Sequence, residues 1–136
     1  MTGALPAQSQ RPSTVLIVDD EQDILHSLQI LLETSMVGVR VLTADSGTKG
    51  LEIIQREPVD VVVTDYRMPG MNGLEFLVRA EDLRPEMSKM MITAFPKLEL
   101  AIEAINAVHV NKFLVKPFQP QDFIQKVQQM LENPGH

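Results

Sequence analysis

Short runs of apolar residues alternate along this chain with segments whose apolar residues recur every three or four positions. The short runs predict buried β-strands, and the wider spacing predicts amphipathic helices. The expected strands are Thr14–Val18, Val39–Ala44, Val59–Thr64, Lys89–Thr93 and Lys112–Val115. The expected helices are residues 23–34, a segment capped by Ser46, Leu74–Asp82, Leu98–Ala107 and a last segment that starts at Pro120.

The helical spacing also predicts which helical residues face the core. They are Ile24, Leu25, Leu28, Leu31, Leu32, Leu51, Ile54, Leu74, Leu77, Val78, Ala101, Ile102, Ile105, Phe123, Val127, Met130 and Leu131. The strands are apolar at nearly every position, which is typical of strands buried on both faces of a parallel sheet. We therefore expect a flavodoxin-like α/β fold: a doubly wound, parallel, five-stranded (βα)₅ sheet with strand order 2-1-3-4-5.

Length and composition suit one globular domain. The 136 residues are 44% hydrophobic and 22% charged, which is usual for such a domain. We expect a flexible leader over residues 1–13, the domain over residues 14–131 and a tail over residues 132–136. The leader lacks the basic start and apolar stretch of a secretory signal, and no apolar run approaches the ~20 residues of a membrane helix. These features predict a cytoplasmic protein without membrane contact.

Cysteine content and net charge exclude some kinds of site. The chain has no cysteine, which rules out disulfides and thiolate metal sites. Its net charge is −6, and a charge of this sign argues against nucleic acid as a direct partner.

Polar groups follow four of the expected strands, each at the strand's carboxyl end. They are Asp19 and Asp20 after the first strand, Asp65 after the third, Thr93 at the end of the fourth and Lys116 after the fifth. Ligands of open parallel sheets bind beyond the carboxyl ends of the strands. Carboxylates, a hydroxyl and an amine at this edge together predict a site that binds a divalent cation and accepts a phosphoryl group.

Each of these residues also has a plainer explanation. Asp65 can act as a nucleophile that forms an acyl phosphate, or it can simply begin a turn. Asp19 and Asp20 can hold Mg²⁺ with phosphate oxygens and water, or one of them can cap the helix that begins near Asp23. Taken alone, Lys116 is an ordinary exposed lysine, and the threonine that ends the fourth strand is an ordinary strand residue. The ordered set favours the phosphate site.

The strings VLIVDDE, VTDYRMPGMNGLEF, ITA and KFLVKPF make residues 14–131 resemble the receiver domain of two-component response regulators. The resemblance implies that Asp65 is the phosphoacceptor. It also implies a Mg²⁺ site made by Asp20 as direct ligand, Asp19 acting largely through water, Asp65, and the backbone carbonyl of Arg67.

The resemblance further implies a conformational switch. Thr93 corresponds to the switch hydroxyl, Lys116 to the lysine that binds the phosphoryl group, and Phe113 to the switch aromatic. Phosphorylation is then expected to change the face made by the fourth helix, the fifth strand and the fifth helix. The stretch AINAVHVNKFLVKPF (104–118) carries Val108 where many relatives have glycine, and it resembles receivers attached to signalling enzymes more than those joined to DNA-binding domains.

The implied partners are a sensor histidine kinase or a histidine phosphotransfer protein as donor, and an effector domain or protein downstream. Such a domain is a signalling switch with at most slow self-dephosphorylation, and not an enzyme. Two alternatives are a receiver-like interaction module without phosphotransfer and an aspartate-nucleophile phosphatase. The phosphatase is disfavoured because Arg67 stands where a second acid is needed. A monomer and a homodimer, and a complete regulator and a piece of a longer one, all agree with the sequence.

Overall fold

The computed structural model describes residues 12–94, 103 and 106–134. Within them, parallel strands form a five-stranded sheet in the order β2-β1-β3-β4-β5. The strands are β1 (Ser13–Val18), β2 (Val39–Ala44), β3 (Val61–Asp65), β4 (Ser88–Thr93) and β5 (Lys112–Val115). The predicted fold class and strand order are confirmed.

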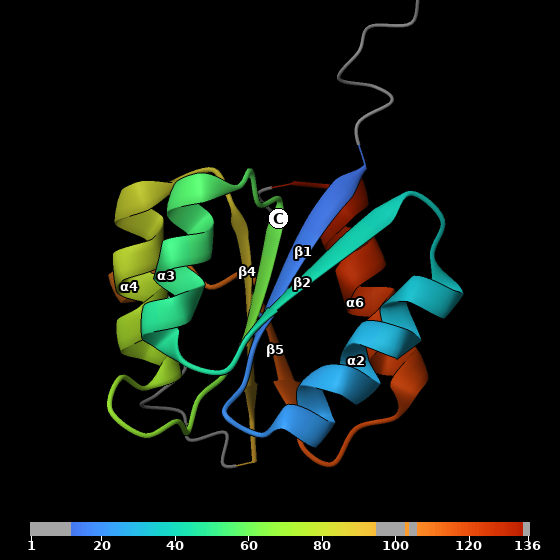
Figure 1. Ribbon diagram of the computed structural model, residues 1–136, viewed down its shortest axis with the longest axis horizontal. Coiled ribbons are helices and arrows are strands. Elements are labelled where there is room, and N and C mark those ends of the chain that lie inside the picture. Colours follow the sequence, from blue (N-terminus) through green and yellow to red (C-terminus); the bar gives the residue numbers. More distant parts are fainter. Residues whose placement is uncertain (1–11, 95–102, 104–105, 135–136) are drawn as a thin grey trace, which may run out of the picture.

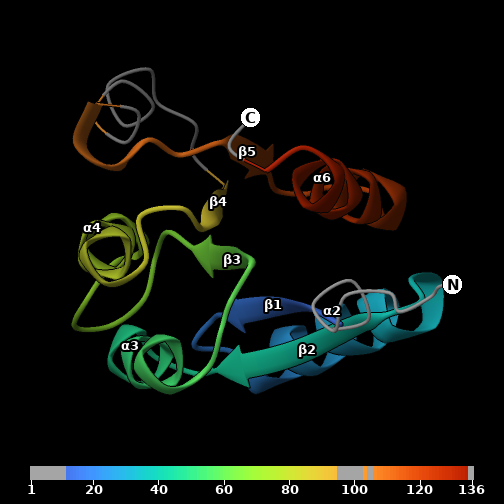
Figure 2. The same cartoon turned by 90° about the horizontal axis from the view of Figure 1, so that it is seen from above.

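Helices cover both faces of this sheet. They are α2 (Gln22–Ser35), α3 (Gly47–Arg56), α4 (Gly73–Leu83) and α6 (Pro120–Glu132). Figures 1 and 2 show α3 and α4 on one face, and α2 and α6 on the other. The predicted helix Leu98–Ala107 falls largely on residues 95–102 and 104–105, which lie outside the described residues. Among the helices in the described ranges, none is both long and apolar enough to span a membrane.

The alternation of side chains along β1 builds a separate core on each face. Leu16 and Val18 belong to the cluster under α3 and α4, whereas Val15 and Ile17 belong to the cluster under α2 and α6. All four are almost fully buried, because successive strand side chains point to opposite faces and both faces are covered. The continuous apolar run therefore supplies both cores.

The predicted strand boundaries are close to those observed. The bounds of β2 and β5 are as predicted, and β1 and β4 begin one residue earlier. β3 begins at Val61 instead of Val59, since its ladder with β1 starts where Val15 pairs with Val61. The preceding Asp60 instead uses its carboxylate to accept the N–H of Thr14, at 2.8 Å. Thus Val59 is buried without belonging to the strand.

One predicted core residue of α4 is wrong. Val78 was expected to face inward but is 36% exposed. The buried residues of this helix are instead Gly73, Leu74, Phe76, Leu77 and Ala80. Val78 lies about 100° of rotation beyond Leu77, outside the arc that these residues define. Phe76, which the apolar spacing missed, fills the core in its place and has no exposed area.

Candidate functional site

Three carboxylates converge at the carboxyl edge of the sheet. Asp19 and Asp20 directly follow β1, and Asp65 is the last residue of β3, the strand that pairs with β1. One oxygen atom from each side chain lies within 4.8 Å of the other two. The topology brings these acids together, because parallel neighbours end at the same edge.

The three acids differ in burial. Asp19 is 2% exposed and Asp65 is 7% exposed, whereas Asp20 lies on the surface. Burial raises the pKa of Asp19 from its usual 3.8 to about 6, and the negative charges of Asp65 and Asp20 add to the rise. The N–H of Glu21 donates to Asp19 Oδ1 at 2.9 Å and opposes the rise. A cation bound here would relieve the repulsion between these carboxylates.

Lys116 brings a positive charge to the same place. Its Nζ lies 3.1 Å from Oδ1 of Asp65. The residue follows β5, and its N–H donates to the carbonyl of Thr93 at 2.9 Å. The peptide bond to Pro117 is cis. The Lys116 amine follows β5, which lies two strands away from β3 in the sheet. It nevertheless reaches the carboxylate of Asp65, the last residue of β3.

Thr93 lies at the end of β4, which pairs with β3, and is 3% exposed. It therefore stands at the same edge of the sheet as Asp65. Arg67 is exposed in the loop that follows β3. Phe113 of β5 is half-buried and packs against the cluster under α3 and α4. Their roles as switch hydroxyl, metal ligand and switch aromatic stay predictions.

The capping explanation for the acid pair is wrong. α2 begins at Gln22, and the residue at its cap position is Glu21, whose side chain makes no capping hydrogen bond. Asp19 accepts from Glu21, ahead of the helix, and not from a residue of its first turn. Neither Asp19 nor Asp20 is therefore used to cap α2, and the acid pair needs another explanation.

Sequence reasoning missed the part of Gly73. Its N–H donates to the carbonyl of Tyr66 at 2.7 Å. A Cβ atom at Gly73 would collide with the carbonyl oxygen of Asp65 and lie 2.9 Å from Cα of Tyr66. Only glycine lets the start of α4 approach the backbone of Asp65 this closely. The sequence feature that could have indicated this close approach is the glycine at the first position of the helix after Asp65. From the sequence alone, this segment is interpreted only as a turn.

The acids fit a small, hard divalent cation. Mg²⁺ prefers carboxylate oxygens at about 2.1 Å, so two direct ligands lie at most about 4.2 Å apart. Oxygens that already lie within 4.8 Å of one another need only a small inward movement, or a water in place of one direct bond. Asp19, Asp20 and Asp65 can thus hold Mg²⁺, with Lys116 beside them to meet an anionic ligand.

Comparison with known proteins agrees with this geometry. The sequence model of the response regulator receiver domain matches residues 15–128. The hydrogenase transcriptional regulatory protein HoxA of Cupriavidus necator is 33% identical over 127 residues, which are 93% of this chain and 26% of HoxA. The chemotaxis protein CheY of Pseudomonas aeruginosa is 35% identical over 120 residues, which are 87% of this chain and 95% of CheY.

Solved structures show the same similarity. A CheY-like receiver domain protein of Methanospirillum hungatei superposes with a TM-score of 0.83 at 34% identity, covering 89% of this chain and 94% of that one. The chain spans about a quarter of the length of the first curated relatives that it matches, and nearly all of CheY. The chain belongs to the response regulator receiver domain family of two-component signalling.

Proposed function

We propose that this receiver domain is switched by phosphorylation of Asp65, with a sensor histidine kinase or a histidine phosphotransfer protein as donor. The observation that carries the proposal is the position of the Asp65 carboxylate. It is nearly buried, it ion-pairs with Lys116, and it shares one oxygen cluster with Asp19 and Asp20. A nucleophile, a cation site and an amine thus meet at one point.

In the transfer, a carboxylate oxygen of Asp65 attacks phosphorus in line with the bond to the donor imidazole. The new P–O bond forms as the P–N bond breaks, and the electron pair of that bond stays on the imidazole nitrogen. Mg²⁺ held by Asp19, Asp20, Asp65 and the Arg67 carbonyl would neutralise charge on the phosphoryl oxygens. Lys116 moves from the carboxylate of Asp65 to a phosphoryl oxygen, which keeps its charge paired.

The signal leaves the site through Thr93 and Phe113. The Thr93 hydroxyl donates to a phosphoryl oxygen and moves toward it, and Phe113 turns inward. The face made by β5, α6 and residues 98–107 then shifts between two populated states; of that face, residues 98–102 and 104–105 lie outside the described residues. An effector domain or a separate protein reads this face. Hydrolysis of the acyl phosphate resets the switch slowly.

Phosphorylation from a small donor tests the proposal. The protein is incubated with acetyl phosphate and Mg²⁺, and its mass is measured. We expect the added mass of one phosphoryl group in the wild type and in the control variant Asp82→Asn, which changes an exposed aspartate of α4. Asp65→Asn is expected to gain none.

Three other outcomes would overturn the proposal. Equal labelling of Asp65→Asn, or no labelling of the wild type, would favour a receiver-like interaction module. Many turnovers of a generic phosphate ester per site would favour an aspartate-nucleophile phosphatase.

A further inference from the structure

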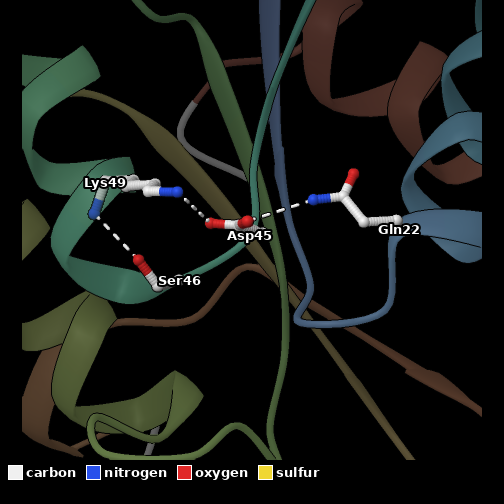
Figure 3. A network of polar contacts seen from close by, with 4 residues as sticks. All are labelled: Gln22, Asp45, Ser46 and Lys49. Atoms are coloured by element: carbon white, nitrogen blue, oxygen red, sulfur yellow. Dashed lines mark hydrogen bonds and ion pairs between the residues drawn. The ribbon is translucent and has the colours of Figure 1, made fainter.

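The loop that carries the two β1 acids is tied to the neighbouring loop on both sides of Asp20. On one side, the N–H of Asp19 donates to the carbonyl of Ala44 at 3.1 Å. On the other side, Nε2 of Gln22 donates to Oδ2 of Asp45 at 3.0 Å. Figure 3 shows Gln22 reaching from the start of α2 to Asp45, beyond the end of β2. The second tie is made by side chains alone.

The carboxylate of Asp45 is also held by residues at the start of α3. Its Oδ1 ion-pairs with Nζ of Lys49 at 3.0 Å, and Lys49 lies in the first turn of α3. The side chain of Ser46 accepts the N–H of Lys49 at 3.2 Å and caps the same helix. The hydrogen bond from Lys49 also lowers the pKa of Asp45. Each oxygen of this carboxylate thus has its own partner, which leaves Oδ2 aimed at Gln22.

Asp20 depends on these ties more than its neighbours do. Asp19 and Asp65 are nearly buried, so packing fixes their side chains. Asp20 is exposed, so only its backbone sets where its carboxylate begins. That backbone is held by the Asp19 N–H before it, by the Glu21 N–H that donates to Asp19 Oδ1 directly after it, and by Gln22 two residues after it. Of these contacts, the one from Gln22 joins the segment to the residue after β2, so its loss is expected to act on Asp20.

We propose that Gln22 and Asp45 are positioning residues that hold Asp20 in the geometry needed for Mg²⁺, and thereby set the Mg²⁺ affinity of the receiver. The inference rests on the proposed function of the acid cluster. Neither residue belongs to the cluster of three acids that would hold the cation. Their contribution is expected to equal that of one solvent-accessible hydrogen bond, which is about a three-fold change in the dissociation constant.

Mg²⁺ titration of the intact chain tests this by calorimetry. Gln22→Met removes the donor at constant length and charge, and we expect Mg²⁺ to bind about three-fold more weakly. Asp45→Ala is expected to weaken binding similarly, and the double variant no further, because both changes break the same contact. Asp45→Asn leaves one oxygen for two donors, Lys49 and Gln22, and is expected to weaken binding no more than Asp45→Ala does.

The control is Gln29→Met, the same change on α2 at a glutamine that donates to Glu33 within the helix. It is expected to leave Mg²⁺ binding unchanged. The rate of labelling by acetyl phosphate should fall in Gln22→Met at low Mg²⁺ and recover at saturating Mg²⁺, which a general loss of structure would not do.

The outcomes separate the two proposals. If the wild type binds Mg²⁺ but Gln22→Met binds it equally well, the positioning role is wrong and the phosphoacceptor site stands. If Asp45→Ala weakens binding as much in the Gln22→Met background as in the wild type, the charge of Asp45 matters and not its contact with Gln22, which also overturns the positioning role. If the wild type binds no Mg²⁺, the proposed function itself fails.

Discussion

Asp19→Asn is expected to make the metal-free protein more stable at neutral pH. The pKa of Asp19 rises from 3.8 to about 6 in the folded protein, chiefly because the carboxyl is buried. One pH unit corresponds to about 1.4 kcal/mol, so ionised Asp19 costs the folded state about 3 kcal/mol. The amide that replaces the carboxylate carries no charge, and its oxygen can still accept the N–H of Glu21. The rise to about 6 already includes the opposing attraction of Lys116, so the expected gain from removing the charge is about 3 kcal/mol.

The sign of the pH dependence follows from the raised pKa. The folded state holds the proton of Asp19 more tightly than the unfolded state does. The contribution of protonated Asp19 to the free energy of unfolding is therefore fully present below about pH 4, and it is lost as the pH rises through about 6. The advantage of Asp19→Asn should accordingly be large at about pH 7.5 and small near pH 4.

Urea unfolding in a chelator at these two pH values measures the difference. Asp20→Asn serves as the control, because Asp20 is exposed and its neutralisation should change stability much less. An advantage of Asp19→Asn that is the same at both pH values would refute the reasoning, as would a variant less stable than the wild type at the higher pH. Saturating Mg²⁺ should stabilise the wild type more than Asp19→Asn, since binding to the folded state adds to its stability.

Three further predictions concern other parts of the fold. Gly73→Ala should slow labelling of Asp65 and cost about 1–3 kcal/mol in urea unfolding, because its methyl group meets the Asp65 backbone. Glu81→Ala should destabilise the protein more than Lys89→Met does, because Lys89 is buried and its Nζ pairs with Glu81 at 3.1 Å; the same unfolding experiment decides. Asn72→Ala breaks the capping box of α4 and should cost about 1 kcal/mol, read from the unfolding midpoint.

Much of this architecture could be read from the sequence. Runs such as Val15–Val18 are apolar at every position, which requires cover on both faces and hence a parallel sheet between helices. Once the strands are parallel, residues that end them share one edge. The meeting of Asp19, Asp65 and Lys116 then follows from the order of the strands, whatever the details of the loops.

What the sequence could not specify depends on local rotation and on contacts between loops. Val78 and Phe76 are both apolar, and the apolar spacing does not show that Phe76 is the buried one, with its ring against Gly50 of α3. The contact between Gln22 and Asp45 joins polar residues 23 positions apart. Polar contacts of this kind do not recur at a regular spacing, so the pattern of hydrophobic residues cannot predict them.

The strand order has a consequence for how this domain is made. The acidic edge draws on β1, β3, β4 and β5, and its amine follows the strand that is synthesised last of the five. A nascent chain that has emerged only as far as β4 holds the carboxylates but not Lys116. The negative charges of this edge therefore gain their ion pair only after the fifth strand docks at the margin of the sheet.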